Sequence, residues 1–170
     1  MSIGAVVLAA GEASRFGTPK QRLLLPEVLE RLEQSSVDEI VVVAGAHTLE
    51  TPANVVTFAG WKRGPGASLS SGLDELDPAH EAAVVVLADG PDLAPAAVDR
   101  VIASWRADGG DLVAASYDGK RGHPLLVARS IWEEIPDVGL RDLDVRLVPC
   151  DDLGHPGDVD TPADLPERLR

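Results

Sequence analysis

The chain has 170 residues, of which 45% are hydrophobic, and this size fits one domain spanning residues 1–170. The net charge of −13 at pH 7 excludes a broad nucleic-acid or anionic-membrane surface, and no window holds the roughly 20 apolar residues of a membrane span. The single cysteine, Cys150, excludes an intramolecular disulfide, which fits a reducing compartment, so we expect a cytoplasmic protein. From the charge and the lack of a membrane span we expect that it binds neither nucleic acid nor membrane.

Runs rich in Val, Ile and Leu alternate with segments compatible with helices, and several of these runs are apolar on both faces. Such runs are typical of central strands in a mainly parallel sheet that helices cover on each side. In chain order the predicted elements are a strand at residues 3–8, a helix at 26–33, strands at 39–44 and 55–58, a helix at 67–76, a strand at 83–87, a helix at 95–107, strands at 112–115 and 124–127, a helix at 130–135, a strand at 145–148 and a last helix that opens at Thr161. This pattern predicts an α/β protein with a single three-layer α/β/α domain and a Rossmann-like sheet. Ligands of such sheets bind beyond the carboxyl ends of the strands, which points to residues 9–20 and 88–94.

The loop after the first strand, residues 8–20, combines small residues with positive charge. Residues 1–25 carry Arg15, Lys20 and Arg22 against Glu12, a net charge of +2 in a strongly acidic chain. Small residues let backbone N–H groups approach a phosphate or a base, and the cations suit a small anion. The loop matches neither a Walker A sequence nor a GxGxxG fingerprint. Taken alone, this loop could also be a simple turn after the strand, without any ligand.

Five motifs follow one another along the chain. They are Leu-Ala-Ala-Gly-x-x-x-Arg-Phe-Gly-x-Pro-Lys at residues 8–20, Gly-Pro-Gly-Ala-Ser-Leu-Ser-Ser-Gly-Leu at 64–73, Leu-Ala-Asp-Gly-Pro at 87–91, Gly-His-Pro at 122–124 and Asp-Val-Asp-Thr-Pro at 158–162. Over most of the chain this series resembles the MobA-like NTP transferases, with Phe16 where the family usually has Met. Within that family, Leu-Ala-Ala-Gly and Pro-Lys resemble the CTP-using molybdopterin cytidylyltransferases, whereas the GTP-using branch typically shows Leu-Ala-Gly-Gly and Asp-Lys.

The resemblance implies a nucleotidyltransferase that moves CMP from CTP to a phosphorylated acceptor, molybdopterin or the molybdenum cofactor, and releases pyrophosphate. It implies His123 as an acceptor-binding residue and a molybdoenzyme or cofactor-assembly protein as a partner. The implied nucleotide-binding residues are Leu8, Ala9, Ala10, Gly11, Arg15, Lys20, Ser68, Gly72 and Asp89. Helix capping or packing is the alternative role for Ser68 and Gly72, and packing is the alternative role for His123.

Nucleotidyl transfer gathers negative charge on the transferring and leaving oxygens, so it requires positive charge and accurate positioning. The guanidinium of Arg15 can donate two parallel hydrogen bonds to phosphate oxygens, and Lys20 can act as a point charge near the α-phosphate. With Asp89 they form the predicted catalytic set. A Mg²⁺ ion needs hard oxygen ligands, for which Asp89 and Asp158 are the candidates. Turn formation is the alternative for Asp89, and we rank Asp158 above Asp160 because capping of the last helix also accounts for Asp160.

Two regions, after Leu25 and after Gly45, are shorter than the usual pattern of the family. The alternatives to a cytidylyltransferase are GTP use or another acceptor, a nucleotide-binding accessory protein without catalysis, and an oxidoreductase of the same family. The joint presence of Arg15, Lys20 and the two candidate metal ligands argues against an accessory protein. The missing dinucleotide fingerprint argues against an oxidoreductase.

Overall fold

The computed structural model of the chain describes residues 2–10, 20–45, 49 and 51–170. The strands are β1 (Ile3–Ala9), β2 (Glu39–Ala44), β3 (Asn54–Thr57), β4 (Ala82–Leu87), β5 (Leu112–Tyr117), β6 (Lys120–Ala128) and β7 (Arg146–Pro149). The α-helices are α1 (Lys20–Glu33), α2 (Pro65–Glu75) and α3 (Pro95–Asp108). Short 3₁₀ segments are η1 (Trp61–Arg63), η2 (Arg129–Glu134), η3 (Asp151–Leu153), η4 (Pro162–Asp164) and η5 (Glu167–Leu169).

The strands form one seven-stranded sheet in the order β3-β2-β1-β4-β6-β5-β7. β1 pairs in parallel with β2 and β4, β2 with β3, and β5 with β7. β6 is the exception, because it runs antiparallel to both β4 and β5. The sheet is therefore mixed but mostly parallel, as predicted.

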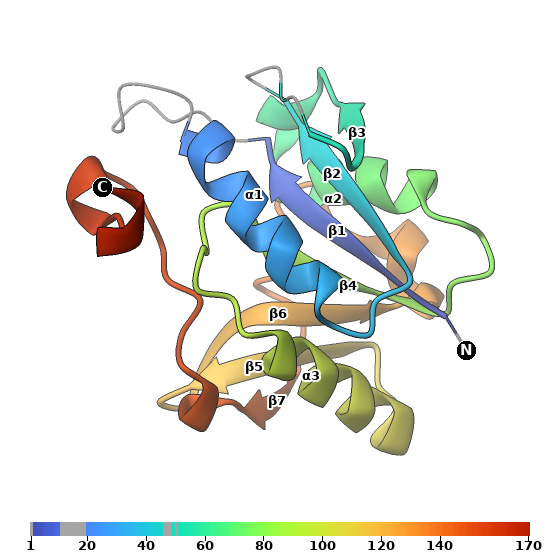
Figure 1. Ribbon diagram of the computed structural model, residues 1–170. Coiled ribbons are helices and arrows are strands. Elements are labelled where there is room, and N and C mark those ends of the chain that lie inside the picture. Colours follow the sequence, from blue (N-terminus) through green and yellow to red (C-terminus); the bar gives the residue numbers. More distant parts are fainter. Residues whose placement is uncertain (1, 11–19, 46–48, 50) are drawn as a thin grey trace.

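Helices cover both faces of the sheet, and the architecture has three layers (Figure 1). α1 and α3 lie on one face, where Leu25 and Val28 of α1 share a core with Val98 of α3. α2 lies on the other face and packs Leu69 and Leu73 onto the strands. This confirms the predicted α/β/α arrangement and explains why the central strands are apolar on both sides. Within the described residues, no helix is long and apolar enough to cross a membrane.

α1 begins at Lys20, whereas the sequence predicted a helix from residue 26. Pro26 lies inside the helix and is exposed. A proline in a helix interior costs about 3 kcal/mol. Leu24, Leu25 and Val28 are buried on either side of it, and each buried aliphatic side chain contributes about 1.5–3 kcal/mol. Burial of the apolar face thus outweighs the local penalty.

The chain ends in two 3₁₀ turns, η4 and η5, in place of the predicted last helix. Pro166 stands between them, and a proline disfavours helical conformation in the residue before it. Thr161 does open the first turn, since its N–H and its hydroxyl donate to the Asp164 carboxylate at 3.0 and 3.1 Å. Likewise, the predicted helix at residues 130–135 is the 3₁₀ segment η2, which ends just ahead of Pro136.

A hairpin joins β5 to β6 and extends β6 back to Lys120, so that His123 lies inside a strand. The turn residues Asp118 and Gly119 have φ values of 53° and 73°. Positive φ at both central positions is typical of the two-residue turns that match the twist of paired strands. The predicted strand at residues 124–127 is only the second half of this longer strand.

Candidate functional site

Three strands bring their predicted functional residues to one edge of the sheet. β1 and β4 are parallel neighbours, and their pairing continues to Leu8 opposite Leu87. Asp89 follows directly in the turn after β4. β6 runs antiparallel to β4, so His123, near its beginning, lies by the carboxyl end of β4. The topology thus brings together Leu8 and Asp89, predicted for the nucleotide, and His123, predicted for the acceptor.

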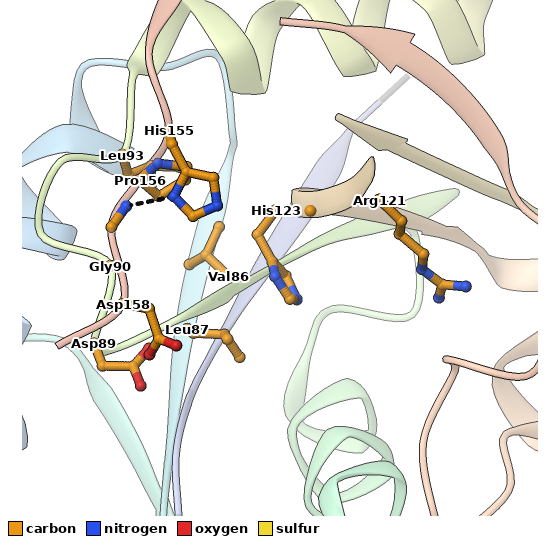
Figure 2. Close-up of a pocket in the computed structure, with 12 residues that line it drawn as sticks. Val86, Leu87, Asp89, Gly90, Leu93, Arg121, His123, His155, Pro156 and Asp158 are labelled. Atoms are coloured by element: carbon orange, nitrogen blue, oxygen red, sulfur yellow. Dashed lines mark hydrogen bonds between the residues drawn. The ribbon is translucent and has the colours of Figure 1, made fainter. Parts of the chain in front are cut away.

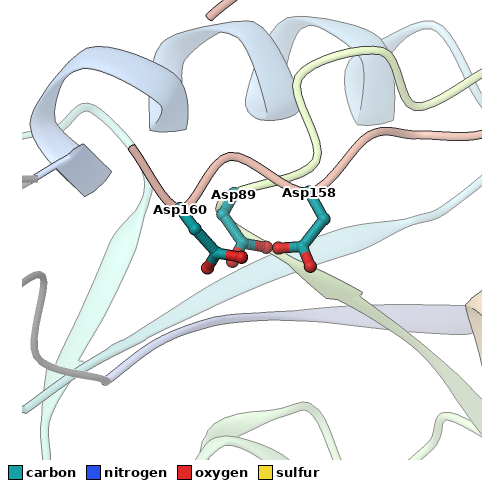
Figure 3. Close-up of side chains that lie close together, drawn as sticks. All are labelled: Asp89, Asp158 and Asp160. Carbon is teal, nitrogen blue, oxygen red and sulfur yellow. The ribbon is translucent and has the colours of Figure 1, made fainter. Parts of the chain in front are cut away.

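Three carboxylates converge at this edge (Figure 3). One oxygen each from Asp89, Asp158 and Asp160 lies within 4.8 Å of the other two. Asp158 is exposed, and the other two residues are partly buried. Val159, between the two C-terminal acids, is only 2% exposed. This alternation is that of an extended chain, in which residues two apart point to the same side.

The C-terminal segment is fixed to the turn that carries Asp89. The Val159 N–H donates to the Asp89 carbonyl at 3.1 Å, and the Asp92 N–H donates to the Pro156 carbonyl at 2.8 Å. The Val159 side chain packs in a small apolar cluster with Leu24 of α1. Backbone hydrogen bonds and apolar packing together hold acids that are some 70 positions apart in the chain.

The donor set fits a hard divalent cation. Mg²⁺ and Mn²⁺ take carboxylate oxygens, usually completed by phosphate oxygens and water. Three carboxylates this close together repel one another, and a divalent cation among them would offset that repulsion. Asp160, ranked below Asp158 on the sequence, belongs to the same cluster. The signal for it was the spacing of the two acids, which sets both on one side of an extended chain.

Two cavities share lining residues at the beginning of β6, and Figure 2 shows the smaller one. The larger has a volume of about 620 Å³ and is lined mainly by apolar side chains, among them Leu8 and Leu87. The smaller has a volume of about 220 Å³ and contains Asp89 and Asp158. Among the described residues, those that line both cavities are Leu87, Arg121, Gly122 and His123. The sequence pattern did not single out Arg121, although it stands next to the Gly-His-Pro motif.

His123 sits between the cavities as an uncharged imidazole. Burial, with the nearby positive charge of Arg121 and a further contribution from His155, lowers the pKa of His123 to about 4. At neutral pH the ring can therefore donate one hydrogen bond to a ligand and accept another, but it adds no positive charge. The Tyr117 hydroxyl donates to the His123 carbonyl at 2.8 Å, which holds this part of β6 in place.

The predicted phosphate loop falls largely outside the described residues. Gly11 and Arg15 lie outside them, and of Lys20 only the backbone position, at the start of α1, is described. Ala9 and Ala10 are buried at the end of β1, at 4% and 8% exposure. The roles of these residues stay predictions.

Ser68 and Gly72 lie on the buried side of α2. A Cβ on Gly72 would come within 2.7 Å of the side chains of Val6 and Val43, so a glycine is needed for α2 to approach the sheet this closely. Packing accounts for Gly72 without a ligand. Contact of either residue with a nucleotide stays a prediction.

The sheet order and the helices that cover the sheet define the class of protein. The fold is a three-layer α/β domain of the nucleotide-diphospho-sugar transferase type, which solved nucleotidyltransferases share. Residues 5–149 match the family model of the MobA-like NTP transferase domain. The chain therefore belongs to the MobA-like NTP transferase family, as its motifs predicted.

Relatives of known name extend this result. The chain is 33% identical over 127 residues to the "Probable molybdenum cofactor guanylyltransferase" of Chloroflexus aggregans. That match covers 69% of this chain and 60% of the relative, so the chain spans less than two thirds of the relative's length. The solved Rv0371c homolog from Mycobacterium sp. strain JC1 is 30% identical, with a TM-score of 0.81 over 98% of this chain and 94% of that one. Rv0371C of Mycobacterium tuberculosis H37Rv, solved in complex with manganese, is 26% identical, with a TM-score of 0.77 and 96% of each chain covered.

Proposed function

We propose that the chain transfers a nucleotidyl group from a nucleoside triphosphate to a phosphorylated acceptor and releases pyrophosphate. One observation carries the proposal: in a member of this family, Asp89, Asp158 and Asp160 converge beside cavities at the ends of β1 and β4. The name of the relative from Chloroflexus aggregans supports molybdopterin or the molybdenum cofactor as the acceptor. We further propose a cytoplasmic location and a molybdoenzyme or cofactor-assembly protein as partner.

In this proposal the three aspartates hold one or more divalent cations, with Mg²⁺ as the physiological ion. The donor set suits it, and the manganese-bound neighbour supports a divalent metal in this fold. When bound, such an ion neutralises charge on the triphosphate and on the leaving pyrophosphate.

The chain's own residues position the two substrates. We propose that backbone groups of residues 8–11, together with Ser68 and Gly72, bind the nucleoside. Arg15 and Lys20 then stabilise the charge that develops at the transferring phosphate. His123, as a neutral imidazole, hydrogen-bonds the acceptor. No side-chain base is required, because a phosphate monoester is already ionised near neutral pH.

We favour CTP as the nucleotide because Ala10 and Pro19 resemble the cytidylyltransferase branch. GTP is the second candidate, and the guanylyltransferase name of the relative supports it.

Calorimetric titration with CTP, GTP, ATP and NADH, each with and without Mg²⁺, tests the proposal. We expect CTP or GTP to bind only with the metal, and Asp89→Asn or Asp160→Asn to weaken that binding by about tenfold or more, a loss of about 1.4 kcal/mol. Asp74→Asn is the matched control, because Asp74 is exposed on α2 and outside the cluster. Equal, metal-independent affinities in all three variants would contradict the metal site, and binding of NADH alone would favour the oxidoreductase alternative.

Release of pyrophosphate separates an enzyme from an accessory protein. With molybdopterin as acceptor, we expect release that requires both the nucleotide and Mg²⁺. Tight nucleotide binding without any pyrophosphate release would support the accessory protein instead.

A further inference from the structure

A segment without helix or strand, residues 136–143, forms one wall of the larger cavity, and we call it the wall segment. Residues 138–141 line the cavity. Its internal backbone hydrogen bonds are two short turns, from the Gly139 N–H to the Pro136 carbonyl at 2.9 Å and from the Leu143 N–H to the Leu140 carbonyl at 3.1 Å. The shape of the cavity on this side therefore depends on what the wall segment is attached to.

One end of the wall segment is attached to the start of α2. The Asp137 carbonyl accepts the N–H groups of Gly66 at 2.9 Å and Ala67 at 3.4 Å. The Asp137 carboxylate also pairs with Arg63 at 3.2 Å, in an exposed position. These contacts hold residues 136–137. In the other half, the Leu140 side chain is 7% exposed and packs in the core cluster that contains Leu69, and the backbone has a further partner.

That partner is Arg121 of β6. Its Nη2 donates to the Leu140 carbonyl at 2.8 Å, and its Nη1 donates to the carbonyls of Leu143 at 3.2 Å and Arg141 at 3.4 Å. Figure 2 shows the side chain extending away from the carboxylates of Asp89 and Asp158. Within the described part of the chain, the guanidinium donates its hydrogen bonds to these backbone carbonyls.

An arginine suits this task because its planar guanidinium presents several donors in fixed directions, whereas a lysine presents one small ammonium group. Partial burial lowers the pKa of Arg121, in agreement with a guanidinium that is partly shielded from water and hydrogen-bonded to the carbonyls. Arg121 also lines both cavities. The same residue thus hydrogen-bonds the wall of the larger cavity and borders the smaller cavity, which Asp89 and Asp158 also line.

We propose that Arg121 is a positioning residue: by holding the wall segment against β6, it sets the shape of the larger cavity and thereby the affinity for the acceptor. This inference rests on the proposed function and places the acceptor in the larger cavity, because His123, the proposed acceptor contact, lines it. Among the described residues proposed to bind the nucleotide, Leu8 lines this cavity, whereas Ala9, Ala10, Ser68 and Gly72 do not. Loss of the Arg121 attachment should therefore weaken acceptor binding and change nucleotide binding little.

The test compares Arg121→Met, Arg121→Lys and Arg106→Met. Methionine keeps an apolar side chain and removes every hydrogen-bond donor. Lysine keeps the positive charge but lacks the planar guanidinium. Arg106→Met is the control, because Arg106 is an exposed arginine on α3. With molybdopterin as acceptor, we expect Arg121→Met to raise the KM for molybdopterin about tenfold or more, the change that about 1.4 kcal/mol of lost binding produces. kcat and the KM for the nucleotide stay within about twofold, a smaller change than about 0.5 kcal/mol. Arg121→Lys falls between, and Arg106→Met matches the unaltered protein.

Hydrogen–deuterium exchange gives a second readout that does not depend on activity. In Arg121→Met, exchange at residues 136–143 should rise while exchange in β1 and β4 stays unchanged. If this variant does not fold, Arg121→Lys carries both measurements.

Three results would overturn the inference: an unchanged KM for molybdopterin, a loss confined to kcat, or unaltered exchange of the wall segment. Absence of turnover by the unaltered protein with molybdopterin would instead refute the proposed acceptor. The exchange measurement would then decide by itself whether Arg121 holds the wall segment.

Discussion

Gly66→Ala tests how closely α2 and the wall segment must approach. A Cβ at residue 66 would lie 1.7 Å from the Pro136 carbonyl oxygen and 2.8 Å from the Gly139 nitrogen. Both atoms belong to the backbone, so no rotation of a side chain can relieve the clash. An alanine therefore forces the first turn of α2 away from residues 136–139.

The cost follows from what that separation breaks. The Asp137 carbonyl loses hydrogen bonds from the N–H groups of Gly66 and Ala67, each worth about 1 kcal/mol. Overpacking adds about 1–3 kcal/mol. Alanine regains about 1 kcal/mol over glycine through its helix propensity. The net expected loss in the free energy of unfolding is about 2–4 kcal/mol.

Urea unfolding followed by circular dichroism measures this loss. Gly119→Ala is a useful contrast, because Gly119 has a φ of 73° but a Cβ at this residue would meet nothing within 4 Å. That variant should lose about 1–2 kcal/mol through backbone strain alone. A Gly66→Ala protein within about 0.5 kcal/mol of the unaltered one, the range of ordinary surface substitutions, would refute the steric argument.

Two further predictions concern titratable groups whose pKa is shifted by burial. Since the pKa of His123 is about 4 in the folded protein and about 6.5 when unfolded, only the unfolded chain gains a proton between these values. The free energy of unfolding should fall by up to about 3 kcal/mol as the pH drops from 7 to 4. Urea titrations should show a weaker pH dependence for His123→Gln, and an identical pH dependence in both proteins would contradict the lowered pKa of His123. The Cys150 thiol is 0% exposed, and burial raises its pKa. It should react with a thiol reagent at pH 8 only after unfolding, and rapid labelling of the native protein would contradict this.

Local patterns were sufficient for the layers of the fold. The runs that became β1, β2 and β4 are apolar on both faces, because helices cover the sheet on each side, and this two-sided burial is visible in composition alone. The position of Asp89 followed from the same logic, since ligands bind after the carboxyl ends of such strands. The family was likewise recognisable from ordered motifs.

Local patterns misplaced the start of α1 and the nature of the last helix. Pro26 looked like a helix start, yet burial of its apolar neighbours carries the helix through it. Thr161 looked like the cap of a full helix, yet Pro166 limits the chain to short turns. In both cases a local preference of a few kcal/mol competed with burial or backbone geometry elsewhere in the segment.

The composition of the site depended on contacts between distant segments. Asp160 faces Asp89 because Val159 packs on α1 and donates to the Asp89 carbonyl. Arg121 reaches the wall segment because a hairpin turn sets the beginning of β6 next to the end of β4. Sequence periodicity records which side of an element is buried, but it carries no information on which distant backbone that side meets. That pairing arises from the packing of the whole chain.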